Sequence, residues 1–83
     1  MYILSKLAPG SYDIELDGQI IAGLVRTERS NRYTWIAELL EPLPPDQRPA
    51  PFTSLEHEFP TFESAVGWLG ATLRNRILQL AEG

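Results

Sequence analysis

The one histidine of the chain lies between two glutamates, in the segment Glu56-His57-Glu58. Imidazole and carboxylate groups bind zinc and carry out acid–base catalysis in many proteins. On an extended strand, successive side chains point to opposite faces, so the two glutamates share one face and His57 takes the other. This spacing opposes joint chelation of a metal. We therefore interpret the segment as a solvated polar strand rather than as a metal or catalytic site.

A second group of acids follows one strand face, at Asp13, Glu15 and Asp17. A catalytic carboxylate pair needs two different environments that separate the two pKa values, whereas a row on an outer face is normally just solvated. The chain has no cysteine, no serine elbow and no glycine-rich phosphate loop. We therefore expect a protein that is not an enzyme, with no catalytic residue, no cofactor and no metal site.

Arginines and aromatic residues gather between positions 26 and 35, and they form the candidate ligand or nucleic-acid contact. Arginine binds phosphate bidentately, and aromatic side chains on a sheet stack on bases. The alternative is that the arginines decorate a hairpin tip while the tryptophan belongs to the core. The net charge of −4 favours that alternative, because nucleic-acid binding normally uses a cationic surface. The group consists of Arg26, Arg29, Arg32, Tyr33 and Trp35.

Antiparallel strands must position these side chains. The alternation from Ser11 to Leu16 predicts a strand, and Asp17-Gly18 predicts a tight hairpin because a type I′ turn needs positive φ at both central residues. A polar turn at 29–32 separates the next two strands. Three strands are expected here, over 11–16, 19–27 and 33–41, and the segments 2–7 and 56–59 are candidates for an edge strand and a short last strand.

A helix is predicted at the C-terminal end, starting from Thr61 as its N-cap. Seven apolar residues fall on one stripe at helical spacing, which predicts a long helix to about Leu80. Gly70 is the alternative stop, as the glycine that follows a shorter helix. The stripe consists of Phe62, Ala65, Val66, Leu69, Leu73, Ile77 and Leu80.

The predicted fold class is therefore α+β: an antiparallel three- or four-stranded meander with one long C-terminal helix packed on one face. The strand expected over 19–27 has apolar residues on both faces between Gln19 and Val25, whereas one helix covers only one face. The other face needs the Pro-rich loop at 42–55, the N-terminal segment or a second chain to shield it. This predicts a non-catalytic protein-interaction or assembly module, which either self-associates as a homodimer or binds a protein partner.

The residues expected at such a protein interface come from two places. Ile20 and Leu24 lie on the strand with two apolar faces. Gly67, Gly70 and Leu78 form a strip on one flank of the predicted helix, off the main apolar stripe. Small residues allow the backbone of a partner to approach closely, whereas an isolated exposed leucine needs no explanation.

The joint from Phe59 to Ala65 resembles the strand-to-helix joint of three-strand-plus-helix DNA-binding domains of the plant AP2 type and of integrase arm-binding domains. In those domains an aromatic residue at the end of a strand leads into a helix that begins with an acidic residue and an alanine. The resemblance covers the last strand and the first helical turn, and it implies strands that bind DNA through basic residues. The strand from Ser11 to Leu16 departs from this, because it carries Asp13 and Glu15 and no basic residue.

The length and composition fit one small folded domain over residues 1–83, with 43% hydrophobic and 22% charged residues. No apolar stretch approaches the roughly 20 residues that a membrane span needs. The apolar start of the chain is too short for a signal peptide. We therefore expect a cytoplasmic protein.

Overall fold

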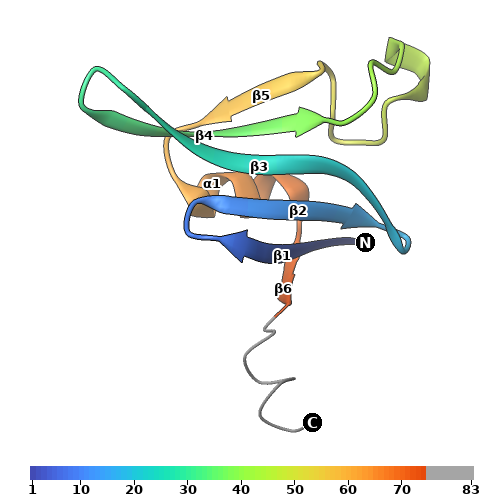
Figure 1. The fold of residues 1–83 in the computed structure, drawn as a ribbon. Helices are drawn as coiled ribbons and strands as arrows, with labels where there is room; N and C mark the ends of the chain where they lie inside the picture. The colour runs from blue at the N-terminus through green and yellow to red at the C-terminus, as the bar shows by residue number, and fades with distance from the viewer. Residues whose placement is uncertain (75–83) are drawn as a thin grey trace, which may run out of the picture.

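The computed structural model describes residues 1–74, and these fold into one mixed sheet with one helix (Figure 1). The sheet has six strands in the order β5-β4-β3-β2-β1-β6, and β1 to β5 form a meander. The predicted meander is confirmed, but the prediction of three or four strands, all antiparallel, is wrong because β6 pairs in parallel with β1. The elements are β1 (Tyr2–Ala8), β2 (Ser11–Leu16), β3 (Gln19–Arg29), β4 (Arg32–Leu39), the 3₁₀ turn η1 (Pro45–Gln47), β5 (Glu56–Phe59), α1 (Phe62–Leu69) and β6 (Thr72–Arg74).

Two tight turns join the central strands, and the β2–β3 register shifts by one residue between Ile14 and Glu15. Asp17 and Gly18 have φ of 52° and 85°, and Ser30 and Asn31 have φ of 50° and 64°. Positive φ at both central residues is the type I′ geometry, whose twist matches that of the strands that it joins. The predicted hairpins are confirmed. The second turn contains only two residues, so β3 and β4 are paired as far as Arg29 and Arg32.

The prediction of a long C-terminal helix is wrong, because α1 contains eight residues and ends at Leu69. Thr61 is its N-cap as expected, and its hydroxyl accepts a hydrogen bond from the Ser64 amide. Gly70 follows with φ of 64° and ψ of 36°, the left-handed conformation that ends helices. The alternative with Gly70 as the stop is therefore confirmed. The predicted helix positions Ile77, Leu78 and Leu80 lie outside the described residues.

The residues after Gly70 form a strand instead of more helix. Thr72, Leu73 and Arg74 pair in parallel with Ile3, Leu4 and Ser5 of β1. A short helix has little stability of its own in water, whereas the unpaired side of β1 offers backbone hydrogen bonds. The expectation that residues 2–7 form an edge strand is therefore wrong in one respect. They form a strand, but β6 covers that edge.

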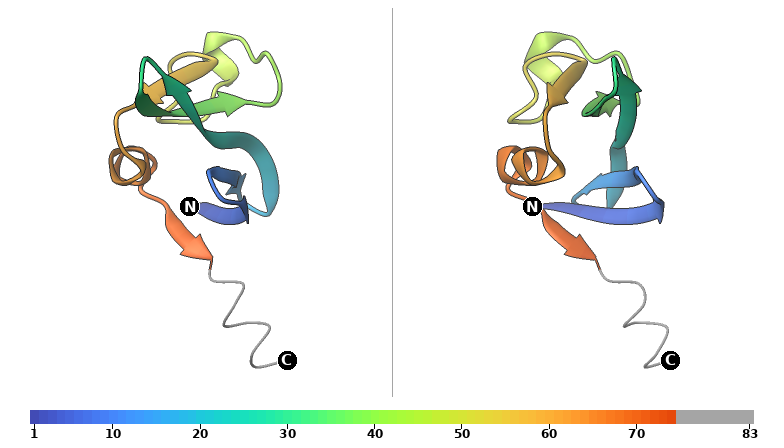
Figure 2. Two further views of the ribbon diagram at one scale, coloured as in Figure 1. Left: turned by 60° about the vertical axis from the view of Figure 1, so that its left-hand side comes forward. Right: turned by 90° about the vertical axis from the view of Figure 1, so that its left-hand side faces the viewer.

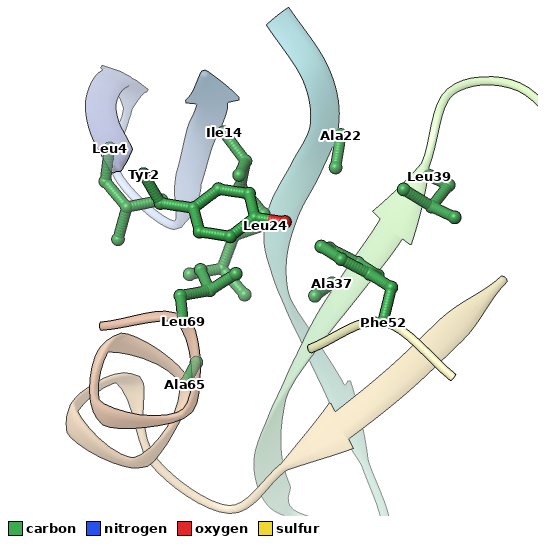
Figure 3. Packing of buried hydrophobic residues seen from close by; sticks show 10 residues of the cluster. All are labelled: Tyr2, Leu4, Ile14, Ala22, Leu24, Ala37, Leu39, Phe52, Ala65 and Leu69. Atoms are coloured by element: carbon green, nitrogen blue, oxygen red, sulfur yellow. The ribbon is translucent and has the colours of Figure 1, made fainter. Parts of the chain in front are cut away.

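The sheet curves around α1, which lies on its concave side together with the core (Figure 2). We call this concave side the inner face and the opposite, convex side the outer face. Leu69 and Ala65 of the helix point toward side chains from β1 to β4 (Figure 3). The buried core consists of Tyr2, Leu4, Ile14, Ala22, Leu24, Ala37, Leu39, Phe52, Ala65 and Leu69.

The Pro-rich segment between β4 and β5 also packs on the inner face. Phe52 is buried in the core and contacts the Tyr2 ring, with the ring centroids 6.2 Å apart. The Tyr2 hydroxyl donates a hydrogen bond of 2.7 Å to the Ala50 carbonyl. The loop and the helix therefore cover the same face. The N-terminal segment is itself part of the sheet, so neither it nor the loop shields the outer face.

Candidate functional site

The arginine–aromatic group at the β3–β4 hairpin divides between the two faces. Arg26 pairs with Trp35, Glu28 with Tyr33, and Arg29 with Arg32. Because side chains alternate along each strand, Arg26 lies with the two aromatics on the inner side, and Arg29 and Arg32 lie on the outer side. The five residues predicted as one site therefore form two groups.

On the inner side, Arg26 is stacked against aromatic rings. Its guanidinium carbon lies 4.6 Å from the Tyr33 ring centroid and 6.0 Å from that of Trp35, which is cation–π geometry. Gly10 makes room for this arrangement, since a Cβ there would lie 3.3 Å from the Arg26 Cβ. The Gly10 carbonyl also accepts a 2.8 Å hydrogen bond from the Arg26 amide. The aromatic rings therefore position the guanidinium, and the hydrogen bond to Gly10 positions the Arg26 backbone.

The two aromatic residues of this group have different surroundings. Trp35 is half-buried, with its ring centroid 5.1 Å from Phe62 and 6.1 Å from Tyr12. It therefore belongs to the packing beneath the hairpin, as the alternative interpretation expected. Tyr33 is 58% exposed. Only Tyr33 offers an aromatic ring to a ligand.

On the outer side, the two arginines also differ. Arg29 forms an ion pair of 3.2 Å with Glu58, and both side chains are at least half exposed. Pairs of this kind contribute about 0.5 kcal/mol to stability. Within residues 1–74, no carboxylate lies within ion-pair distance of Arg32. The hairpin tip thus presents one cation that the described part of the chain does not neutralise.

His57 has a structural environment on the inner face. Its ring centroid lies 4.5 Å from that of Trp68 and 5.8 Å from that of Phe52. Its Nε2 accepts hydrogen bonds from the amides of Thr53 and Ser54, at 3.2 and 3.1 Å. The two flanking glutamates lie on the other face, as the alternation predicted. The expectation of a solvated histidine is wrong, because the ring is half-buried and holds the Pro-rich segment against β5.

The outer face is organised in rows of paired residues across the strands. The central row runs through Ser5, Asp13, Gly23, Glu38 and Glu56, from β1 to β5. Three of these five residues are acidic, and Gly23 lies in the middle. We call these five residues the central row.

Apolar side chains lie on both sides of the central row. Ile20 is 50% exposed, Val25 is 47% exposed, and Leu40 is 63% exposed. Val25 pairs with the half-buried Ile36 of β4, next to the central row. No described segment packs over these residues. The strand with two apolar faces therefore has one face in the core and one face in solvent.

The carboxylates of the outer face are only partly neutralised. Glu15 pairs with Arg74 at 3.4 Å across the β1 strand, and Glu58 pairs with Arg29. For Asp13, Glu38 and Glu56, residues 1–74 supply no cation within 4.0 Å. The middle of the outer face therefore carries uncompensated negative charge.

The other residues predicted for a protein interface have separate outcomes. Ile20 is exposed, but Leu24 is fully buried on the inner face and takes no part in a surface. Gly67 and Gly70 are exposed on α1 and after it. The conformation of Gly70 explains its identity without a partner. Leu78 lies outside the described residues.

Comparisons with known proteins give no further guidance. No family model, no curated protein and no solved structure matches the chain. Among the described residues, no helix is long and apolar enough to cross a membrane. The same part of the chain contains no cluster of three or more histidines or carboxylates that could hold a metal ion.

Proposed function

We propose that this domain is a non-catalytic protein-interaction module that binds a partner protein through the outer face of its sheet. The observation that supports this most is that only one face of the sheet is covered by other segments of the described chain. The helix and the Pro-rich segment both pack on the inner face, whereas Ile20, Val25 and Leu40 remain in water on the outer face. Exposed apolar groups gathered on one face are typical of interaction surfaces.

Charge indicates what kind of partner this face accepts. The carboxylates of Asp13, Glu38 and Glu56 form a row between apolar side chains and have no cation near them in residues 1–74. A basic surface with apolar groups on both sides of its basic residues complements this pattern. A second copy complements it poorly, because like charges placed opposite each other across an interface are destabilising.

Charge reversal on one face tests this proposal. The immobilised domain is used to recover proteins from its native host, and each recovered protein is then purified and titrated by calorimetry. Glu38→Lys reverses a charge on the outer face. Glu28→Lys makes the same change on an exposed residue of the inner side of the hairpin. We expect Glu38→Lys to weaken binding at least tenfold and Glu28→Lys to leave it unchanged.

Several outcomes would contradict the proposal. One is a purified partner that binds wild type and both variants equally. Another is recovery of no specific partner by the wild-type domain. Sedimentation equilibrium at micromolar concentration gives a third. A stable dimer that dissociates on Glu38→Lys would show that the outer face binds a second copy of the chain rather than a basic partner.

A second candidate function is nucleic-acid binding at the β3–β4 hairpin. It is favoured by one observation, namely the exposed Tyr33 ring beside the stacked Arg26 guanidinium, with Arg32 on the other side of the strand. Base stacking on an aromatic ring and phosphate contacts from arginine are the typical elements of single-strand binding. The acidic outer face opposes a wide nucleic-acid footprint.

Fluorescence anisotropy with labelled single-stranded RNA and DNA tests this second function. Binding should weaken with salt by about one unit of log–log slope for each phosphate neutralised. Arg29→Glu combined with Arg32→Glu should abolish it, and Tyr33→Ala should weaken it. No detectable binding at low salt would rule the second function out.

A further inference from the structure

Gly23 lies two residues after the irregular pairing at Ile21, but its own backbone does not require a glycine. Its φ is not in the positive range that favours glycine, and a Cβ there would meet only the Tyr12 carbonyl oxygen, at an ordinary contact distance of 3.9 Å. A larger residue therefore fits. Glycine in a strand interior stabilises the sheet less than a β-branched residue does. It often marks a bulge or a place where a ligand or another backbone approaches closely.

Gly23 lies between two acidic residues on the outer face of the sheet. It pairs with Asp13 on one side and with Glu38 on the other, in the middle of the central row. Adjacent strands are about 4.8 Å apart, so the two acidic residues are about 10 Å apart across it. The missing side chain leaves a notch whose floor is backbone and whose two walls carry carboxylates. Val25, two residues further along β3, lies beside it.

The β1 end of the same row is closed to a partner. Ser5, which pairs with Asp13, is 2% exposed, and its buried Oγ has no hydrogen-bond partner within the described residues. The part of the central row that a partner can reach therefore begins at Asp13.

We infer that the notch at Gly23 receives an arginine side chain of the partner protein. This rests on the proposed function and names the group that the outer face recognises. A guanidinium is planar and carries donors along its edges, so it can lie on the glycine backbone and donate to carboxylates on both sides. Its methylene groups pack beside Val25. A lysine ammonium, as a compact point charge, does not use both walls in this way.

Calorimetric titration with short synthetic peptides tests this inference. One peptide alternates arginine with valine, and a second alternates lysine with valine. Gly23→Val fills the notch, and Gly67→Ala is the matched control, because it adds a side chain to an exposed helical glycine with nothing within 4 Å of the new Cβ. We expect the arginine peptide to bind wild type and Gly67→Ala equally. Gly23→Val should bind at least tenfold more weakly with an unchanged or higher Tm, and the lysine peptide should bind wild type more weakly.

Four results would overturn the inference. They are unchanged affinity in Gly23→Val, equal affinity for the lysine peptide, no binding of the arginine peptide to wild type, and a large fall in Tm for Gly23→Val, which would show that the fold needs the glycine. The proposed function fails separately. If Glu38→Lys weakens the binding of a purified partner while Gly23→Val does not, the outer face binds the partner without an arginine side chain in the notch.

Discussion

At the scale of single residues, the polar groups on the inner face fasten the Pro-rich segment to the sheet. Tyr2 does this from β1, through its hydrogen bond to the Ala50 carbonyl, and His57 does it from β5, through the amides of Thr53 and Ser54. Both rings also contact Phe52. These contacts keep the segment against the core, where its prolines cannot donate the hydrogen bonds of a sheet ladder.

The Tyr2 hydroxyl makes a pH-dependent contribution to stability. Burial, and secondarily the charge of Asp17, raise the pKa of Tyr2 above its ordinary value of 10.0. The folded state therefore favours the neutral phenol. Its contribution is fully present below pH 10 and is lost as the pH rises through the higher pKa of the folded state. We expect Tyr2→Phe to lower the free energy of unfolding by about 1 kcal/mol at neutral pH.

Urea unfolding over a range of pH measures this effect. The difference between wild type and Tyr2→Phe should narrow as the pH rises above 10. A difference that stays constant through that range would show that the hydroxyl does not titrate differently in the two states.

His57 is expected to act as a hydrogen-bond acceptor rather than as a ligand. His57→Phe keeps a ring against Trp68 but leaves the amides of Thr53 and Ser54 without their acceptor. Because these amides lie near solvent, water replaces part of the loss, and we expect a cost of about 1 kcal/mol in urea unfolding. His57→Ala also removes the ring contact and should cost more. If His57→Phe is neutral, the two hydrogen bonds do not hold the segment.

At the scale of elements, the strand after Gly70 changes which leucines belong to the core. Leu69 is 6% exposed at the end of α1, whereas Leu73 is 53% exposed in β6. Truncation of a buried leucine costs about 2–5 kcal/mol, so Leu69→Ala should unfold much of a domain of this size at 37 °C. Leu73→Ala should cost about 1 kcal/mol or less.

Thermal unfolding followed by circular dichroism compares these two variants. In one long amphipathic helix, both leucines would lie on the buried stripe and would cost similar amounts. Equal losses of Tm would therefore contradict the structure and restore the long helix.

Local chemistry explains which elements the sequence predicts. Asp17-Gly18 and Thr61 act through their immediate neighbours, so the first hairpin and the start of the helix follow from a few residues. The end of the helix was ambiguous, because Gly70 is a local stop signal but the apolar spacing continues across it to Leu73. The strand after Gly70 could not be predicted in this way, because it depends on a parallel pairing with β1, about 70 residues away in the sequence. Pairing over such a distance leaves no local signal.

The candidate site was predictable to a similar degree. Side chains alternate between the faces, and the turn at Ser30-Asn31 contains two residues. Arg26 therefore lies on one face of the sheet and Arg29 and Arg32 lie on the other, as soon as the β3–β4 register is known. The outer face was indicated by the apolar run in β3. Gly23 was missed, although a glycine in the middle of that run was a visible signal. Its meaning depends on the neighbours Asp13 and Glu38, and the pairing with Asp13 follows from a register shift between Ile14 and Glu15 that the sequence does not show.

At the scale of the whole molecule, the two faces of the sheet have different roles. The inner face is covered by helix α1 and by the Pro-rich segment, which supply Leu69 and Phe52 to the core (Figure 3). The outer face combines exposed apolar groups with carboxylates that residues 1–74 do not neutralise. This combination is the basis of our proposal that the outer face binds a basic partner rather than a second copy.

The most direct test of this account is to map where a basic ligand binds. Amide chemical shifts of the wild-type domain are recorded by NMR as the peptide that alternates arginine with valine is added. We expect the largest shifts at the central row, at Asp13, Gly23 and Glu38, and unchanged amide signals in α1 and at the hairpin tip. Shifts confined to α1 or to the hairpin around Tyr33, or no shifts at all, would contradict it.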